Sequence, residues 1–291
     1  MEGRKKYKLI IAGIKIAINM PENLELPNVG FHFEENFQDG KEDVKYEIKC
    51  ESHIENPPGT LLRSIGECEL YHCDHKYVYM YTFQIPGKKE MARLELSHDQ
   101  TDNVLYIPQE YAQECMRYLF SMLGMELILL RHNRICMHGA LVRYQGEGMI
   151  FTGPSGIGKS TQSNLWEKYE HAEILNGDRV IIQEDEQMIG HGSPYAGSSG
   201  IYRKEQAPIK AIIMLKQAKE NHIERLTGIQ AFKTLFPRFL VFSVDEYTET
   251  LYNMIQRIVE EVPIYLLSCR PDQEAVELVK ETVFGHNCEK V

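Results

Sequence analysis

The sequence has no uninterrupted apolar run of the roughly 20 residues that a helix needs to span a bilayer. The run from Leu119 to Leu130 is too short and is broken by Glu126. Near the basic N-terminus, Lys15 interrupts the apolar segment, and no small-residue cleavage site follows it, so the pattern is not that of a signal peptide. We therefore expect a cytoplasmic protein with no membrane partner.

An excess of basic residues is also missing. Lys and Arg number 32 and Asp and Glu number 42, which gives a formal net charge of −10 at pH 7. Because nucleic acids and anionic membranes repel a chain this acidic, we expect no nucleic acid among its partners. The 291 residues, of which 43% are hydrophobic, are typical of a globular protein with one large domain or two smaller ones.

The regular cysteine spacing of a disulfide-rich scaffold is absent as well. An odd number of scattered cysteines in a chain of this size is typical of a reducing compartment. The seven are Cys50, Cys68, Cys73, Cys115, Cys136, Cys269 and Cys288.

The first hundred residues are rich in β-branched and aromatic residues, separated by Gly, Pro, Asp and Asn turn signals. The predicted strands are 7–18, 44–50, 76–84, 91–97 and 103–107. From Pro108 the pattern changes, and apolar positions at helical spacing over 109–131 predict one long helix. We therefore expect a β-rich N-terminal subdomain over 1–108 and a second domain over 109–291.

The second domain alternates between short apolar runs and helical patterns, which predicts a mixed α/β fold. Strands are predicted at 134–137, 139–144, 148–152, near 173–183, at 209–215 and at 263–268. Helices are predicted after 159, around 228–238 and 245–259, and at 272–283.

A phosphate-binding loop of the form G-x-x-x-x-G-K-S lies between the strand 148–152 and the helix after 159, which is the context this motif requires. Glycines let the backbone wrap closely around phosphates, and the helix N-terminus adds partial positive charge. The loop consists of Gly153, Pro154, Ser155, Gly156, Ile157, Gly158, Lys159, Ser160 and Thr161. We expect Lys159 to reach the outer phosphates of ATP and the Ser160 hydroxyl to ligate Mg²⁺.

Two further residues are candidates for the chemistry. Asp178 lies between two short apolar strands that follow the loop helix, so the chain returns beside the phosphates at this carboxylate. It could be a ligand of Mg²⁺ or the base that takes a hydroxyl proton. His138 lies on the strand before the loop, where a single histidine is more often structural than catalytic.

The ordered set of His138-Gly139, the loop 153–160 and Asn176–Val180 resembles the kinase domain of HPr kinase/phosphorylase. It is also similar to the nucleotide-binding core of ATP-dependent phosphoenolpyruvate carboxykinase. The resemblance implies that His138 lies near the reacting phosphate and that Asp178 is the catalytic base. It also implies an HPr-kinase-like P-loop core in the second domain.

The chain departs from that family at two places. The family's Asp pair is Gly177-Asp178 here, and its signature with a metal-binding Glu corresponds to 191–200, which holds no Glu. We therefore expect kinase activity without efficient phosphate-driven dephosphorylation. The segment 191–200 instead looks like the HPr-kinase-like proteins of modified-peptide biosynthesis, which include kinases for a serine of a lasso-peptide precursor.

The small residues of 192–200 could form an ordinary surface loop, or a loop near the triphosphate that admits the acceptor or contacts phosphate. Arg203, which follows this segment, and Arg270 are candidates for contact with the γ-phosphate.

Three functions remain open from the sequence. The first is an ATP- and Mg²⁺-dependent kinase that acts on a hydroxyl, most simply a Ser of a peptide or small protein. The second is a kinase for a small hydroxylated metabolite such as free serine, and the third is a non-catalytic ATP-binding accessory protein. For the first of these functions, the β-rich N-terminal subdomain would help to bind the partner or form a homo-oligomer.

Overall fold

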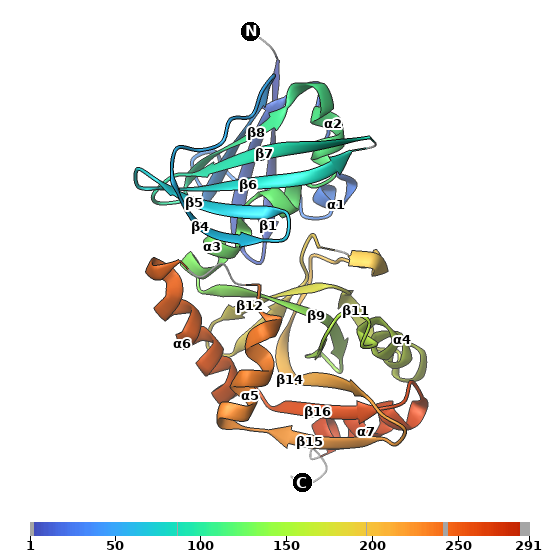
Figure 1. Ribbon diagram of the computed structural model, residues 1–291. Coiled ribbons are helices and arrows are strands. Elements are labelled where there is room, and N and C mark those ends of the chain that lie inside the picture. Colours follow the sequence, from blue (N-terminus) through green and yellow to red (C-terminus); the bar gives the residue numbers. More distant parts are fainter. Residues whose placement is uncertain (1–2, 86, 196, 241–243, 286–291) are drawn as a thin grey trace. The chain divides into compact units, whose positions relative to one another are not determined.

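A computed structural model describes residues 3–285 of the chain, except 86, 196 and 241–243. The chain divides into two compact units, Met1–Ile128 and Leu129–Val291 (Figure 1). The sequence predicted the boundary at residue 108, but the segment 109–128 belongs to the first unit. The reason is local packing, because Leu119 and Leu123 are buried and the Tyr46 hydroxyl donates to the Leu123 carbonyl at 2.6 Å.

The first unit is built on one eight-stranded sheet in the order β1-β2-β3-β8-β7-β6-β5-β4. β3 pairs in parallel with β2 and β8, and all the other neighbours are antiparallel. The strands are β1 (Arg4–Ile11), β2 (Ile14–Pro21), β3 (Val44–Glu51), β4 (Thr60–Ile65), β5 (Cys68–Cys73), β6 (Lys76–Ile85), β7 (Lys88–Leu96) and β8 (Asp102–Pro108). A short helix, α1 (Asn28–Phe31), lies between β2 and β3.

Two predictions for this unit are wrong in detail. The single strand predicted over 7–18 is a hairpin, because Ala12 and Gly13 form a turn with φ of 48° and 80°. The long helix predicted over 109–131 is four short pieces, and Gly124 at φ 59° separates the last two. The pieces are η1 (Gln109–Tyr111), α2 (Ala112–Met116), η2 (Leu119–Met122) and α3 (Met125–Arg131).

The second unit is a mixed α/β fold, which confirms the predicted class. Its strands follow the order β10-β9-β12-β13-β14-β16-β15, with β11 paired to β9 and β10 also paired in parallel to β14. They are β9 (Arg134–Tyr144), β10 (Glu147–Thr152), β11 (Glu173–Asn176), β12 (Arg179–Glu184), β13 (Met188–His191), β14 (Gln206–Gln217), β15 (His222–Leu226) and β16 (Ile264–Cys269).

The helical elements of this unit are α4 (Lys159–Glu170), η3 (Gly197–Ser199), α5 (Gly228–Leu235), η4 (Phe236–Arg238), α6 (Asp245–Glu261) and α7 (Gln273–Phe284). The two strands predicted at 134–137 and 139–144 are one strand, β9, and the sequence did not predict β13 or β15. The helix predicted over 228–238 ends at Leu235, because Pro237 follows within one turn.

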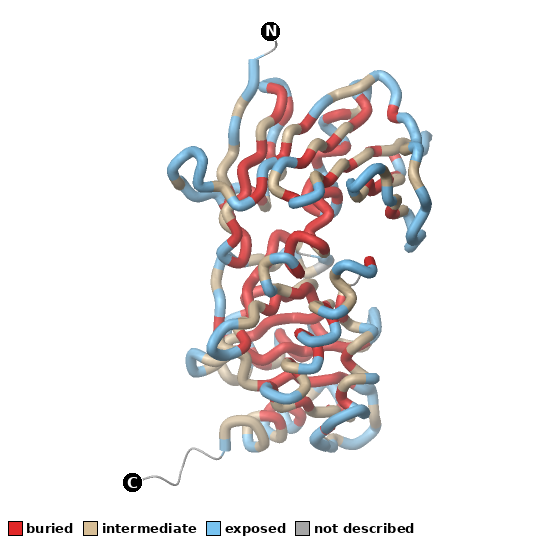
Figure 2. The backbone as a smooth tube through the Cα atoms, turned by 90° about the vertical axis from the view of Figure 1, so that its left-hand side faces the viewer, coloured by how far each residue is buried: buried red, intermediate tan, exposed pale blue. Residues whose placement is uncertain are grey.

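Helices cover both faces of this sheet. Along β14, Ile212 and Met214 pack in the cluster that contains the buried residues of α5 and α6. Ala211 and Ile213 alternate with them and pack in the cluster with α4 and α7. Since successive side chains of a strand point to opposite faces, the central segment of β14, 211–215, is apolar at every position. Figure 2 shows long buried stretches of chain inside the unit, with exposed residues mainly at the surface turns. Among the described residues, no helix is long and apolar enough to cross a membrane.

Candidate active site

The two edges of strand β9 have different neighbours, and this pairing assembles the site. β12 and then β11 lie along one edge, and β10 lies along the other. Up to His138 it pairs with β12, and from Gly139 onward it pairs with β10. His138 lies opposite Arg179, and Gly139 lies opposite Thr152. Because β12 begins directly after Asp178 and β10 ends directly before Gly153, the register brings both segments to His138.

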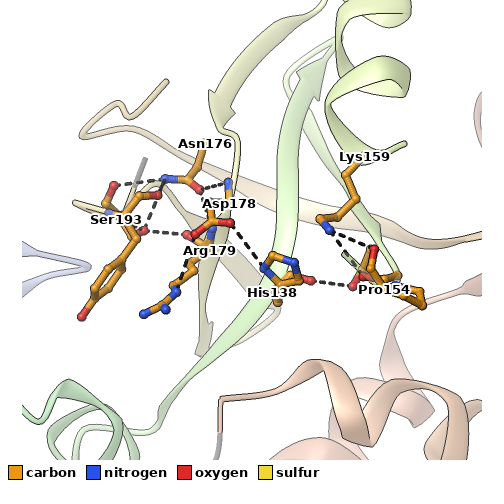
Figure 3. A network of polar contacts seen from close by, with 10 residues as sticks. His138, Pro154, Lys159, Asn176, Asp178, Arg179 and Ser193 are labelled. Atoms are coloured by element: carbon orange, nitrogen blue, oxygen red, sulfur yellow. Dashed lines mark hydrogen bonds and ion pairs between the residues drawn. The ribbon is translucent and has the colours of Figure 1, made fainter. Parts of the chain in front are cut away.

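Hydrogen bonds hold the three segments together at this point. The Thr152 hydroxyl donates to the His138 carbonyl at 2.6 Å, and the Gly139 N–H donates to the Asp178 carbonyl at 2.9 Å. The predicted residues His138 and Asp178 therefore meet at the start of the predicted phosphate loop (Figure 3).

The Asp178 carboxylate lies between two nitrogen groups. His138 Nδ1 is 3.5 Å from one carboxylate oxygen and Arg179 Nε is 3.7 Å from the other. Burial and the nearby Lys159 ammonium lower the pKa of His138, although Asp178 opposes them. The lowered pKa favours the neutral imidazole at pH 7, and the Asp178 side chain is accessible, with 27% of its surface exposed.

Asn176 fixes the position of Asp178. Its side chain is fully buried, and its Oδ1 accepts from the N–H groups of Asp178 at 2.9 Å and Arg179 at 2.8 Å. Its amide nitrogen donates to the carbonyls of Ser193 at 3.0 Å and Tyr195 at 3.2 Å. Asn176 had no role of its own in the sequence analysis, although Asn favours turns because its side chain can accept a hydrogen bond from the backbone two residues on.

The same contacts bring the segment 192–200 to the site. The Ser193 hydroxyl donates to the Arg179 carbonyl at 2.6 Å, and the Tyr195 ring lies 4.7 Å from the Arg179 guanidinium carbon. Gly197, at φ 53°, approaches Asp178 so closely that a Cβ there would lie 2.7 Å from the Asp178 side chain. Of the two interpretations left open by the sequence, the structure favours a loop that belongs to the site.

The predicted phosphate loop connects β10 to α4. Gly158 is the N-cap of α4 at φ 117°, and no side chain caps the helix there. Gly156, at φ 76°, has open space where a side chain would project, and Ser155, Ser160 and Thr161 are exposed. The first N–H groups of α4 thus have no helical partner and border open space, which suits a phosphate group.

Lys159 is a buried cation, 8% exposed, with weak local partners. Its ammonium lies 3.4 Å from the carbonyls of Gly153 and Pro154 and forms no ion pair with any described residue. Burial lowers the pKa of Lys159, the Asp178 carboxylate raises it, and the guanidinium of Arg238 lowers it further. A buried ammonium with two long contacts to neutral oxygens fits a site that receives an anion.

The two arginines predicted to touch the γ-phosphate are engaged elsewhere. Arg203 is half-exposed and lies 4.0 Å from Glu205. Arg270 is paired with Asp272 at 2.8 Å and with Glu274. Neither guanidinium contacts Lys159, His138 or Asp178 in the part of the chain that the structure describes.

His191 supports the loop that carries Ser193, and it gives the second unit a pH dependence. Burial, with a smaller contribution from Arg134, lowers its pKa to about 4, and its Nε2 lies 2.9 Å from the Gln183 side-chain oxygen. The ordinary pKa of about 6.5 applies in the unfolded chain, so between about pH 6.5 and about pH 4 only the unfolded state binds this proton. The free energy of unfolding must therefore fall as the pH falls through this window.

We expect this residue to remove about 2 kcal/mol of stability between about pH 7 and about pH 5. The measurement is urea unfolding followed by the fluorescence of Trp166, the chain's single tryptophan, which is fully buried in this unit. Between about pH 7 and about pH 5, the free energy of unfolding of His191→Gln should fall by about 2 kcal/mol less than that of wild type. The exposed His222→Gln is the matched control, and equal pH dependence of wild type and His191→Gln would contradict the expectation.

Comparison with known proteins gives one sequence relative of the predicted kind. HPr kinase/phosphorylase from Lactobacillus delbrueckii subsp. bulgaricus is 31% identical over 84 residues, which cover 28% of this chain. The match spans only about a quarter of the relative's length, 26%. No family model matches the chain.

Among solved structures, the HPr(Ser) kinase/phosphatase from Coxiella burnetii aligns with 52% of this chain and 89% of its own. The sequence identity is 13% and the TM-score is 0.31.

Proposed function

We propose that the second unit transfers the γ-phosphoryl group of Mg²⁺·ATP to a hydroxyl, most simply a Ser of a peptide or small protein. The observation that carries the proposal is the register of β9, which brings Asp178 and His138 to the start of the loop that holds Lys159. The sequence similarity to an HPr kinase/phosphorylase supports phosphoryl transfer as the reaction class.

The residues of the loop fit a triphosphate. Lys159 is a buried cation without an ion pair in the described chain, and Gly156, just before the N-terminus of α4, faces open space. The exposed Ser160 hydroxyl is the oxygen ligand that the loop would offer to Mg²⁺. When bound, Mg²⁺·ATP supplies the phosphoryl group and the metal neutralises charge on the phosphate chain.

In this proposal Asp178 is the general base. Its carboxylate accepts the proton of the acceptor alcohol as the alcohol oxygen bonds to the γ-phosphorus and the bond to ADP breaks. His138 and Arg179 hold the carboxylate from both sides, and Asn176 fixes the turn that carries it. Lys159 offsets negative charge on the phosphoryl group during transfer.

The experiment measures ADP release from Mg²⁺·ATP with three classes of acceptor. They are Ser-containing peptides, their Ser→Ala counterparts, and free serine. Mass spectrometry then locates the phosphoryl group on the product. Phosphorylation of the Ser peptides supports the proposal, and phosphorylation of free serine alone makes the enzyme a small-molecule kinase. Nucleotide binding without any transfer would leave only the accessory role.

Gly197 provides a test of the contact with Asp178. Gly197→Ala introduces a Cβ that meets the Asp178 side chain, so we expect at least a tenfold loss of kcat as the carboxylate is displaced. Gly200→Ala is a matched control, because Gly200 also has a positive φ, 66°, but faces open space. Both variants share the backbone strain of a non-glycine residue in this region, so equal losses of kcat would contradict a specific effect on Asp178.

A further inference from the structure

Arg238 is a cation that neither the motifs nor the resemblance singled out. It ends η4, and the chain after it lies against β9, where Phe239 forms an antiparallel bridge with Met137 and the Leu240 N–H donates to the Cys136 carbonyl at 2.9 Å. Continuing this antiparallel register by one residue places Arg238 beside His138.

Phe239 bridges to the same edge of β9 that β10 pairs with, and β10 leads directly into the phosphate loop. β12 occupies one edge of β9 up to His138, so the bridge to Phe239 uses the opposite edge. β10 occupies that opposite edge only from Gly139 onward and then turns into the loop at Gly153. Arg238 therefore enters the gap in the sheet where the loop begins.

The charge environment of Arg238 is unbalanced. Its Nε is buried and has no hydrogen-bond partner, and its guanidinium forms no ion pair with any residue the structure describes. Its charge is close enough to Lys159 to lower the pKa of that ammonium. Lys159 and Arg238 are thus two cations near the loop, and Asp178 is the carboxylate that raises the pKa of Lys159.

Such an arrangement is unfavourable until an anion enters between the cations, because like charges repel and a buried guanidinium nitrogen without an acceptor loses its hydration. A guanidinium presents a planar fork of donors that matches two phosphate oxygens. Arg203 and Arg270, by contrast, already have carboxylate partners.

We propose that Arg238 binds the γ-phosphate of the nucleotide and, with Lys159, offsets the charge on the phosphoryl group as it is transferred. This inference rests on the proposed function. Because ADP has no γ-phosphate, Arg238 would contribute to ATP binding and not to ADP binding. Arg238 is then the residue with which the site distinguishes substrate from product.

The experiment measures the affinities for a non-hydrolysable ATP analogue and for ADP by calorimetry in the presence of Mg²⁺. Arg238→Ala and Arg238→Met are compared with wild type, since Met retains much of the length of the side chain without the charge. The exposed Lys233→Ala on the preceding helix α5 is the control. Thermal unfolding without nucleotide confirms that each variant is folded.

We expect both Arg238 variants to bind the ATP analogue about tenfold or more weakly and to bind ADP within about twofold of wild type. The control should bind both nucleotides like wild type. Equal weakening for the two nucleotides, or no weakening for either, would overturn the role of Arg238 and leave the proposed function standing. Failure of the wild-type protein to bind either nucleotide would overturn the proposed function, and this inference with it.

Discussion

Asp178→Asn is expected to slow phosphoryl transfer by about 10²–10⁴-fold, the usual contribution of a general base, while ATP affinity stays close to that of wild type. Asn keeps the size of the side chain but cannot accept the proton of the alcohol. The turn should survive, because it depends on the Asn176 side chain and on the backbone N–H of residue 178.

The measurement pairs calorimetry for ATP with turnover on the identified acceptor. Asp185→Asn is the matched control, since Asp185 is exposed at the end of β12. Loss of ATP binding together with turnover would make Asp178 chiefly a metal ligand or a structural residue. Turnover within a few-fold of wild type would show that the base lies elsewhere.

Lys159→Ala is expected to weaken ATP binding by about 10–100-fold, because a charge-assisted hydrogen bond to phosphate contributes roughly 1.5–3 kcal/mol. The nucleotide-free variant should be at least as stable as wild type, since Lys159 has only two long contacts to carbonyl oxygens and its ammonium is buried. Weaker ATP binding without a loss of stability would show that Lys159 serves to bind the nucleotide and is not needed for folding.

Calorimetry and thermal unfolding measure these two quantities. Lys168→Ala, an exposed position near the end of the same helix, is the control. Unchanged ATP affinity and turnover in Lys159→Ala would contradict the assignment of residues 153–161 as a phosphate loop.

The local part of the site could be predicted from the sequence. The loop between β10 and α4 is recognisable because its glycines, Lys159 and Ser160 are consecutive in the chain, with a strand before them and a helix after them. The same holds for Asp178, which is placed by the short return from α4 through β11. Patterns of this kind depend on backbone preferences over a few residues.

The rest depends on register between distant strands, which the sequence does not express. Asn176 acts through contacts to Ser193 and Tyr195, and Arg238 reaches the site through a bridge between Phe239 and Met137. Arg203 and Arg270 are a different case, because their carboxylate partners Glu205, Asp272 and Glu274 lie only two to four residues further along the chain and could have been read from the sequence.

Helical periodicity over 109–131 illustrates the same limit in the first unit. The apolar spacing there reports burial against the β-sheet, and it does not reveal that the chain breaks at Gly124 into short helices. Ala12 in the first hairpin is a similar case, because a non-glycine residue at φ 48° is stabilised by the pairing of β1 and β2 and carries no turn signature of its own.

The central claim is that the loop 153–161 holds a triphosphate whose terminal phosphate faces Asp178. A crystal structure of the protein with Mg²⁺ and a non-hydrolysable ATP analogue tests it most directly. We predict phosphate oxygens within hydrogen-bonding distance of the Lys159 ammonium and of the first N–H groups of α4, with the Asp178 carboxylate on the open side of the γ-phosphate. A nucleotide bound away from this loop, or a γ-phosphate that points away from Asp178, would contradict the claim.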